Sequence, residues 1–521
     1  MPPAMNGGQL LAKTASKAGI EVCFANPGTT ELPMVLALDS EPGIRAILGL
    51  FEGVCTGAAD GYGRMLDRPA MTLLHLGPGL ANGIANLHNA RKAKTPLVNM
   101  IGQHTTWHLA ADAPLAMDIE ALAGTVSGWQ RTSKSPATLS QDLAEAVAAS
   151  RYGQVATLIV PNDYQLAECT VTKVATPQFW FDPVDLRAIE EAARAMRTSD
   201  KTGLIIGGRA LREPGLHAAA HIQAVTGCDV LTDTYPSYLE RGIGLPDVKR
   251  IPHCPESGIK MVSQYQTVIL AGTKEPVTFF GYPGTRSYLL REAQKRWHIA
   301  TPRQDASRAL EYLAEALGAS PGAAIPKGVL PQPSRPDVPR GELTAEKACL
   351  TLAALQPEGA IIVDEGITAA ATYYPLTAGL PKHAFLAVSG GSIGYGMPCA
   401  VGAAVACPDR PVINLQADGS AMYTVQALWT QAREALDVTT LICSNRSYEI
   451  LKIELARAGV TAMGPKALSL VELNRPDINW VSIAEGMGVP GVTVRTAEEL
   501  ARELPRALSR PGPHLIEMVL V

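Results

Sequence analysis

The chain has 521 residues, of which 47% are apolar and 18% are charged, and its formal net charge is −4. This composition is typical of a soluble globular protein with several buried cores, and it argues against a disordered chain. The nearly balanced charge provides no basic field, so we expect no nucleic-acid partner. The apolar run over residues 397–407 is too short to cross a bilayer, and we expect no membrane partner.

Nine cysteines are scattered along the chain without a Cys-x-x-Cys pair. This pattern predicts neither a disulfide framework nor a structural zinc site, and most of the thiols should be reduced and buried. Residues 1–8 lack the basic and apolar regions of a secretory signal. The sequence therefore predicts a cytoplasmic protein.

Short apolar runs alternate with helical patterns along the chain, which is typical of parallel α/β sheets. Residues 20–25 and 412–415 are examples that we predict to be buried strands. Asp182-Pro183 predicts the start of a helix, because Asp caps helices well and Pro suits a first turn. Residues 321–339 hold several prolines, which favour an extended linker over a helix or a central strand.

These segments predict an α/β protein with three doubly wound parallel-sheet domains. We place the domains at residues 1–165, 180–320 and 342–521. Ligands bind to such sheets beyond the carboxyl ends of the strands. The residues that follow each predicted strand are therefore the candidates for a functional site.

Two polar residues follow neighbouring predicted strands in the third domain. Asp418 and Asn445 would offer two oxygen ligands to a hard cation, and Mg²⁺ prefers such ligands. Gly419 would let a diphosphate approach the backbone, and Ser420 would begin a helix whose N-terminus favours anions. Taken alone, the same residues also fit a turn followed by a helix cap.

In the first domain, Glu52 opens a predicted helix of small residues that extends to Gly63. Such a helix can lie close to another backbone, and a single carboxylate at its start is a candidate for catalysis. Taken alone, Glu52 also fits an acidic residue that the helix dipole favours at an N-terminus.

Together these segments resemble the thiamin-diphosphate (ThDP) enzymes of the acetolactate synthase, pyruvate oxidase and benzoylformate decarboxylase superfamily. The resemblance covers essentially the whole chain, and the motifs occur in the family's order. It rests on Asn26-Pro27-Gly28-Thr29-Thr30-Glu31-Leu32-Pro33, the Glu52 helix, His75-Leu76-Gly77-Pro78-Gly79 with Asn82-Gly83, Gly102-Gln103, Gly391-Ser392-Ile393-Gly394-Tyr395-Gly396-Met397-Pro398, and the pair Asp418 and Asn445.

The resemblance implies roles for three residues that would surround the reactive part of ThDP. Glu52 matches the catalytic glutamate that hydrogen-bonds N1′ of the aminopyrimidine. Ile393 matches the bulky side chain that keeps the two cofactor rings in a V shape, and the carbonyl of Gly391 would accept a hydrogen bond from the 4′-amino group. The cofactor carries the difficult chemistry and the protein orients it.

The resemblance also implies the residues that would hold the diphosphate and its metal ion. Asp418 and Asn445 match the side-chain ligands of Mg²⁺, and Ser447 would add a backbone carbonyl. Diphosphate oxygens would be held by Gly419, Ser420 and Tyr448, with Thr368 as a further candidate. The chain departs from the family pattern at Ala417 and Ser444, which directly precede Asp418 and Asn445 and would not bind the metal themselves.

His75 follows a predicted strand and matches an active-site histidine of benzoylformate decarboxylase, which implies proton transfer to and from the substrate. Thr29 matches a substrate-contacting serine of that enzyme and is expected to bind the substrate carboxylate. That enzyme has a second histidine in its middle domain, whereas the matching stretch here, residues 279–284, has none. His104 and His108 are the candidate replacements.

Residues 446–460 match the flap that covers the substrate. Ile450 and Leu451 lie on one predicted helical face there, where they would either line an acyl pocket or pack as core. The middle domain has a strand-to-turn element at residues 204–208 but no convincing Gly-x-Gly-x-x-Gly. The predicted cofactors are therefore ThDP and Mg²⁺, and FAD is disfavoured.

The resemblance implies decarboxylation of a small-molecule 2-oxo acid through an ylide and an enamine, with or without transfer of the acyl carbanion to a second carbonyl. The alternative is an acetolactate synthase-type transferase that condenses two 2-oxo acids. A third hypothesis is a non-catalytic protein with the ThDP fold, and the retention of Glu52, Ile393, Asp418 and Asn445 argues against it. Cofactors of this family lie between the first domain of one subunit and the third domain of another, which implies a homodimer or homotetramer.

Overall fold

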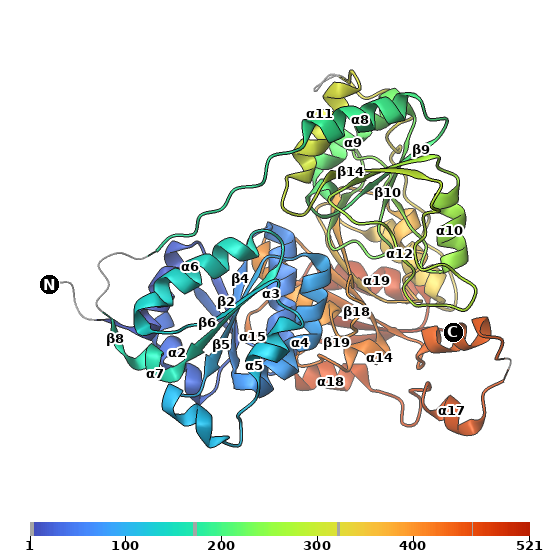
Figure 1. Cartoon of the computed structure of the whole chain (residues 1–521). Helices are drawn as coiled ribbons and strands as arrows, with labels where there is room; N and C mark the ends of the chain where they lie inside the picture. The colour runs from blue at the N-terminus through green and yellow to red at the C-terminus, as the bar shows by residue number, and fades with distance from the viewer. Residues whose placement is uncertain (1–4, 170–174, 320–323, 461) are drawn as a thin grey trace.

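The structure is a computed structural model that describes residues 5–169, 175–319, 324–460 and 462–521. These residues form three parallel or mostly parallel β-sheets flanked by helices, and each sheet occupies one lobe of the molecule (Figure 1). The predicted α/β class with doubly wound parallel sheets is confirmed. The predicted strands at residues 20–25 and 412–415 correspond to β2 (Val22–Asn26) and β17 (Val412–Ala417).

The first sheet has six parallel strands in the order β3-β2-β4-β5-β7-β6, so the strand order reverses between β2 and β4. Helices α1, α2 and α6 cover one face and α3, α4 and α5 cover the other, which explains why the strands are nearly continuous apolar runs. The strands are β2, β3 (Arg45–Leu48), β4 (Ala70–His75), β5 (Leu97–Gln103), β6 (Trp129–Thr132) and β7 (Val155–Pro161); the helices are α1 (Gly7–Lys17), α2 (Leu32–Leu38), α3 (Glu52–Leu66), α4 (Leu76–Ala93), α5 (Ile119–Gly124), α6 (Leu139–Ser150) and α7 (Asn162–Leu166).

A short antiparallel pair ties the start of the first lobe to its end. Strand β1 (Met5–Asn6) pairs with β8 (Glu168–Cys169), which lies just beyond the predicted end of the domain at residue 165. From residue 175 the chain then runs in extended form to the central lobe (Figure 1).

The central sheet has five parallel strands in the order β12-β10-β9-β13-β14. The predicted helix start at Asp182-Pro183 is wrong, because α8 begins at Leu186. Asp185 caps it by accepting a hydrogen bond from Arg187 N (2.9 Å), whereas Asp182 pairs with Arg303 (2.8 Å). The strands are β9 (Thr202–Ile206), β10 (Asp229–Thr232), β12 (Lys249–Arg250), β13 (Thr267–Ala271) and β14 (Lys295–Ala300); the helices are α8 (Leu186–Arg197), α9 (Glu213–Thr226), α10 (Pro255–Ser263) and α11 (Ala306–Ala316).

The third sheet has seven strands in the order β11-β16-β15-β17-β18-β20-β19, and its order reverses between β15 and β17. Strand β11 (Leu239–Arg241) comes from the predicted central domain and pairs antiparallel with β16. The remaining elements are β15 (Ile361–Glu365), β16 (His383–Ala387), β17, β18 (Val438–Ser444), β19 (Gly491–Val494) and β20 (His514–Val519), with helices α12 (Ala345–Leu355), α13 (Gly396–Ala406), α14 (Asp418–Ala421), α15 (Ala427–Arg433), α16 (Glu449–Arg457), α17 (Pro465–Ser469), α18 (Trp480–Gly486) and α19 (Ala497–Leu508).

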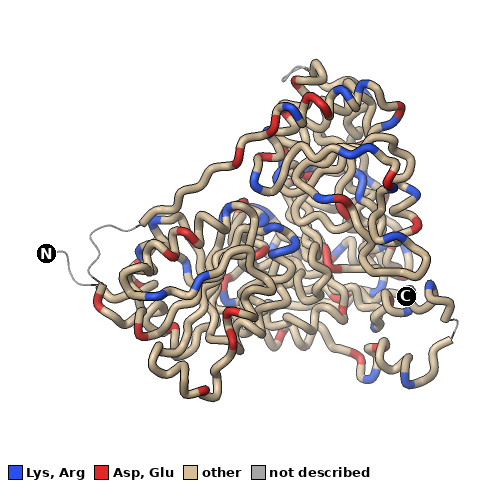
Figure 2. The backbone as a smooth tube through the Cα atoms, in the orientation of Figure 1, with Lys and Arg blue, Asp and Glu red and all other residues tan. Residues whose placement is uncertain are grey.

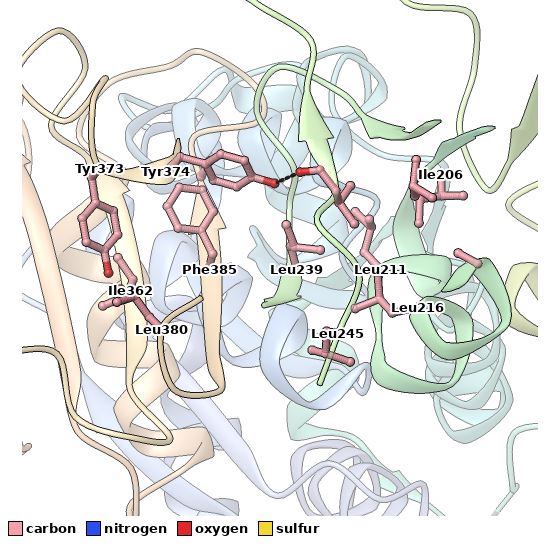
Figure 3. Packing of buried hydrophobic residues seen from close by; sticks show 14 of the residues in the cluster. Ile206, Leu211, Leu216, Leu239, Leu245, Ile362, Tyr373, Tyr374, Leu380 and Phe385 are labelled. Atoms are coloured by element: carbon pink, nitrogen blue, oxygen red, sulfur yellow. Dashed lines mark hydrogen bonds between the residues drawn. The ribbon is translucent and has the colours of Figure 1, made fainter. Parts of the chain in front are cut away.

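The hydrophobic cores cross the predicted domain limits. One cluster joins the central lobe to the third sheet, and Figure 3 shows Leu239 of β11 beside Phe385 of β16 within it. In the same view the hydroxyl of Tyr374 donates a hydrogen bond to the carbonyl of Val248 (2.6 Å). The central lobe is therefore packed firmly against the third sheet.

The predicted linker packs on the third lobe. Residues 324–340 contain no helix or strand, and Ser334 N donates to the carbonyl of Gly379 (2.9 Å). The first part of the prediction, residues 321–323, lies outside the described residues.

Helix α3 of the first lobe crosses α13 of the third lobe at close range, as the small residues of the Glu52 helix predicted. A Cβ on Gly402 would overlap the carbonyl of Ala58, and one on Gly61 would overlap the backbone of Cys399. Glycine is therefore required at this crossing, because the two helix backbones lie in contact.

A buried ion pair fixes the same crossing. Arg64 of α3 pairs with Asp60 (2.6 Å) and also donates to the hydroxyl of Tyr395 (2.9 Å) and the carbonyl of Ala387 (2.7 Å). The neighbouring carboxylate raises the pKa of Arg64 despite the opposing effect of burial, so the guanidinium stays charged. Elsewhere basic and acidic residues are interspersed over the lobes (Figure 2).

Two further expectations concern the cysteines and the membrane. All nine cysteines are free thiols, and seven of them are buried. Among the helices of the described residues, none combines the length and the apolar character that a bilayer span requires.

Candidate active site

The predicted catalytic and cofactor residues lie at equivalent places in the first and third sheets. Open parallel sheets bind ligands beyond the carboxyl ends of their strands, where the strand order reverses. In the first sheet this position is bordered by residues 27–31 and His75, which follow or end β2 and β4. In the third sheet it is bordered by residues 366–368 and Asp418, which follow β15 and β17.

In the first sheet His75 is held by a buried carboxylate. Its Nδ1 lies 2.8 Å from Oε2 of Glu31 and 3.1 Å from the hydroxyl of Thr30. Glu31 is fully buried and also accepts hydrogen bonds from Gly28 N (2.8 Å) and the Thr30 hydroxyl (2.5 Å). A carboxylate in this place orients the imidazole ring. The sequence pattern predicts no role for Glu31, although an acidic residue shortly after a strand end is a usable signal.

Glu52 lies beside His75. It is the first residue of α3 and is 8% exposed, and its Oε2 accepts a hydrogen bond from Nδ2 of Asn82 on α4 (3.0 Å). Its Oε1 and the Cβ of His75 both border Gly79, where an added Cβ would lie 3.3 Å and 3.5 Å from them. The structure thus brings the two predicted catalytic residues together, with Asn82 fixing one carboxylate oxygen.

The other predicted residues of this half gather around His75. His104 follows β5, and its buried Nε2 has no hydrogen-bond partner among the described residues. Burial lowers the pKa of His104, and the neighbouring His108 and His75 lower it further. The rings of His104 and His108 lie 5.4 Å apart. Thr29 is exposed in the turn next to Thr30.

The predicted metal ligands come together in the third sheet. Asp418 follows β17 and Asn445 follows β18, and these strands are neighbours in register. The carboxylate of Asp418 accepts hydrogen bonds from Gly419 N (2.8 Å) and Arg446 N (2.6 Å), and burial raises its pKa to about 6. Oδ1 of Asn445 accepts a hydrogen bond from Ser447 N (3.1 Å).

The turn after β17 is closed by an aromatic ring. A Cβ on Gly419 would overlap the ring of Tyr448, and burial raises the pKa of that phenol. The hydroxyl of Ser420 accepts a hydrogen bond from Nε2 of Gln416 (2.6 Å). The helix predicted to begin at Ser420 begins instead at Asp418 and is only four residues long.

A second buried carboxylate holds the turn that carries Ile393. Glu365, the last residue of β15, is 1% exposed, and its two oxygens accept hydrogen bonds only from N–H groups. The donors and distances are Gly394 N (2.7 Å), Tyr395 N (3.2 Å), Gly396 N (2.6 Å) and Gln416 Nε2 (2.9 Å). Burial raises the pKa of Glu365, but a proton on it would face donors only, so the ionised carboxylate fits best. The sequence pattern does not predict a role for Glu365.

The two halves are linked within one chain by asparagines of α4. Nδ2 of Asn86 lies 2.9 Å from the carbonyl of Gly53 and 3.1 Å from the carbonyl of Gly394. Asn89 donates to the carbonyl of Ser392 (2.8 Å). The backbone next to Glu52 and the backbone next to Ile393 therefore share one donor, while Gly391 has a φ of 72° that favours glycine.

A cavity of about 560 Å³ between the central and third lobes is lined by one predicted diphosphate residue and one predicted pocket residue. Thr368 and Ile450 border it, whereas Leu451 is 46% exposed and lies outside its lining. The predicted face of the flap helix is thus divided, with Ile450 directed to the cavity and Leu451 to the surface.

The residues present fit a diphosphate cofactor with its metal ion. Burial raises the pKa of Asp418 despite the opposing effect of nearby Arg446, and a bound cation would relieve that cost. The oxygens available there are a carboxylate, the amide oxygen of Asn445 and the carbonyl of Ser447, which form a donor set that suits Mg²⁺.

The chain matches two family descriptions, "Thiamine pyrophosphate enzyme, N-terminal TPP binding domain" over residues 5–122 and "Thiamine pyrophosphate enzyme, C-terminal TPP binding domain" over residues 366–518. It is 48% identical over 99% of both chains to a putative acetolactate synthase large subunit of Mycobacterium tuberculosis. The chain belongs to the thiamine pyrophosphate enzyme family. The resemblance read from the sequence motifs is therefore confirmed.

Other members of the thiamine pyrophosphate enzyme family are more distant. A benzoylformate decarboxylase of Pseudomonas aeruginosa is 27% identical over 96% of both chains. The solved structure of a thiamine diphosphate-dependent 4-hydroxybenzoylformate decarboxylase of Rhodococcus jostii RHA1 superposes with a TM-score of 0.84 at 23% identity over 99% of both chains. Its likeness shows that the whole chain has this fold.

Proposed function

We propose that this chain is a ThDP- and Mg²⁺-dependent decarboxylase of a 2-oxo acid, with or without transfer of the acyl unit to a second carbonyl. The observation that carries the proposal is the grouping of Glu52 with His75 and its carboxylate partner at the ligand position of the first sheet. ThDP, when bound, supplies the electron sink that makes loss of CO₂ feasible. The rest of the chemistry falls to the protein's own residues.

One set of residues would hold and orient the cofactor. Glu52, with one oxygen fixed by Asn82, would bind the aminopyrimidine nitrogen N1′. The carbonyl of Gly391 would accept from the 4′-amino group, and Ile393 would support the rings on a turn that Glu365 holds rigid. Mg²⁺ would be bound by Asp418, Asn445 and Ser447, and the diphosphate by Gly419, Ser420, Tyr448 and Thr368.

A second set would handle the substrate and its protons. His75 would transfer a proton at one ring nitrogen while Glu31 holds Nδ1 and balances the charge of the imidazolium. His104, whose Nε2 is unpaired, would serve as the second proton-transfer group, with His108 as its neighbour. Thr29 would bind the substrate carboxylate, and Ile450 would contact the acyl group.

A second candidate function is the acetolactate synthase-type condensation of two 2-oxo acids. The relative at 48% identity bears that name, which favours this alternative. Product analysis by mass spectrometry with a panel of 2-oxo acids, ThDP and Mg²⁺ separates the two functions. Aldehyde as the only product supports the decarboxylase, whereas acetolactate formed from pyruvate supports the transferase.

The catalytic assignment is tested by Glu52→Gln. Loss of the carboxylate should lower turnover of any accepted 2-oxo acid by at least about 100-fold, because the ionised hydrogen-bond partner of N1′ is removed. The folded state should persist, as judged by circular dichroism. Glu485→Gln changes an exposed glutamate and should retain full turnover. Full activity of Glu52→Gln would reject the proposal.

We also propose that the active protein is a homodimer or homotetramer. Large apolar side chains of the first lobe are exposed, including Trp107 (75%), Leu36 (69%) and Leu32 (50%). Leu32 and Leu36 lie one turn apart on α2, and exposed apolar side chains on one helix face are candidates for an interaction surface. Light scattering on the purified protein gives the oligomeric state.

Mixing two inactive variants tests whether each site combines two chains. Glu52→Gln and Asp418→Ala are each expected to be inactive, and refolding them together should restore roughly a quarter of the activity if Glu52 of one chain serves Asp418 of another. The close approach of α3 and α13 within one chain makes the opposite outcome informative. No recovery from a mixed oligomer would place the complete site in a single chain.

A further inference from the structure

The cavity between the central and third lobes contains more than the predicted site residues. Its volume is about 560 Å³, and it is bordered by Thr368 of the third lobe, Ile450 of the flap helix α16, and residues 248–254 of the central lobe. The cavity thus continues from the proposed diphosphate site toward the central lobe. No function was predicted for its central wall.

Two buried nitrogen donors on that wall have no acceptor in the part of the chain that the structure describes. They are Nη1 of Arg250 and Nε2 of His253, and both residues line the cavity. Nδ1 of His253 is 3.3 Å from the hydroxyl of Tyr235, so an imidazole that accepts this hydrogen bond carries its proton on Nε2. Burying a donor without an acceptor costs free energy, and a ligand oxygen would remove that cost.

The guanidinium of Arg250 is held in place before any ligand binds. Its Cζ lies 4.6 Å from the ring centroid of Tyr374 and 5.7 Å from that of Phe385. Stacking of this kind fixes the planar group and leaves its edge free for a second partner. Asp364 is the nearest carboxylate, at 3.9 Å from Nη1, which is too long for a hydrogen bond.

Of the other charged groups that line the cavity, Asp364 has only the distant ionic contact with Arg250, and the rest are already paired among the described residues. Arg241 binds Asp247 (2.7 Å), and Lys249 binds Asp229 on the neighbouring strand (2.6 Å). On the flap helix, Glu454 is 3.2 Å from Arg457. Arg250 is therefore the cation of this cavity with the weakest existing pairing.

We propose that Arg250 and His253 form a binding site for a carboxylate of the substrate that is retained in the product. The inference rests on the proposed function and adds a substrate class to it. An arginine that bound the departing carboxylate would stabilise a charge that is lost in the transition state, which would slow decarboxylation. The carboxylate at Arg250 is therefore either a second acidic group at the far end of the donor 2-oxo acid or the carboxylate of an acceptor 2-oxo acid.

The binding test uses glutarate, a dicarboxylate that cannot react because it lacks the 2-oxo group. Calorimetry on the holoenzyme should show binding that Arg250→Met weakens by about 10- to 100-fold, the usual effect of losing a charge-assisted pair. The uncharged diamide, glutaramide, should bind equally weakly to both proteins. Arg303→Met is the matched control, since Arg303 also pairs with an aspartate (Asp182, 2.8 Å) and stacks on a tyrosine (Tyr152, 4.2 Å) but lies on the surface.

The catalytic test distinguishes the two sources of the carboxylate. If it belongs to the donor, Arg250→Met should lower kcat/KM for 2-oxoglutarate by about 10- to 100-fold and leave 2-oxopentanoate within about threefold. If it belongs to the acceptor, the variant should lose condensation of two pyruvates while still joining pyruvate to acetaldehyde. Arg250→Lys keeps the charge without the fork, and an intermediate effect would show that the loss is not a folding defect.

Two results would overturn the carboxylate site. One is glutarate binding that is equal in the native protein and in a folded Arg250→Met variant. The other is an equal fall in every reaction, including those of substrates with uncharged tails. If the native protein decarboxylates no 2-oxo acid, the proposed function fails, whereas the glutarate measurement still tests this site separately.

Discussion

The first and third sheets each bury a glutamate at or just after the end of a strand, but the two carboxylates have different partners. Glu31 accepts hydrogen bonds from a hydroxyl and one backbone N–H and contacts the titratable ring of His75. Glu365 accepts from four N–H groups and contacts no titratable side chain among its hydrogen-bond partners. The first arrangement orients a histidine ring, whereas the second fixes a backbone turn. In the proposed site, the half that would transfer protons is thus separate from the half that would shape the cofactor.

Among the substitutions in the two sheets, Glu365→Gln should destabilise the protein most, because it disrupts the hydrogen bonds that hold the turn in the third sheet. The NH₂ group of the glutamine would replace an oxygen that accepts from N–H groups, so these buried donors would lose their acceptor. We expect a loss of about 3 kcal/mol in the free energy of unfolding, measured by urea denaturation. The apparent affinity for ThDP, measured by quenching of intrinsic fluorescence, should fall as well because the Ile393 turn loosens.

Glu498→Gln is the matched control for that change. Glu498 also accepts hydrogen bonds from a backbone N–H, that of Gly341 (3.0 Å), but at the protein surface. Its substitution should leave the free energy of unfolding nearly unchanged, as substitutions at the surface usually do. Equal effects of the two variants would show that the carboxylate at Glu365 has no special role.

The two sheets should also respond differently to acid. His75 has a carboxylate partner, whereas the buried His383 of β16 has only the carbonyl of Pro381 at 2.8 Å from its Nδ1. Burial lowers the pKa of His383 to about 4, below the value of about 6.5 in an unfolded chain. The stability that a neutral His383 gives is complete above pH 6.5 and is lost as the pH falls toward 4.

The expected size of this acid effect is about 2 kcal/mol between pH 7 and pH 5. Urea denaturation at the two pH values measures it. His383→Gln should remove this part of the pH dependence, whatever its effect on stability at pH 7. An unchanged pH dependence in the variant would mean that other groups cause it.

Glu31→Gln, the matching change in the first sheet, should have the smallest effect on the free energy of unfolding. A glutamine can still accept from Gly28 N and donate to the Thr30 hydroxyl, so stability should change little. The charge opposite His75 is lost, and we expect kcat/KM to fall about tenfold, equal to about 1.4 kcal/mol. A drop in stability with an unchanged kcat/KM would make Glu31 a structural residue only.

The sequence predicted those parts of the molecule that depend on short-range patterns. The strands followed from continuous apolar runs, and Asp418 and Asn445 followed from their places at the ends of two such runs. The start of α8 was missed because Asp182 and Asp185 both suit a cap, and only the geometry at Arg187 N separates them. Glu31 and Glu365 were missed because their partners lie 44 and 29 to 51 residues away in the chain.

Strand β11 has a consequence for any attempt to divide the protein. It covers the edge of β16, which would otherwise present unpaired backbone groups along the side of the third sheet. A truncated protein that lacked the central lobe would expose the edge of β16 and should aggregate by strand pairing with other copies. Because β11 precedes β16 in the chain, the strand that covers this edge is synthesised before the third sheet forms. The central lobe therefore protects the third sheet from pairing with other copies during synthesis.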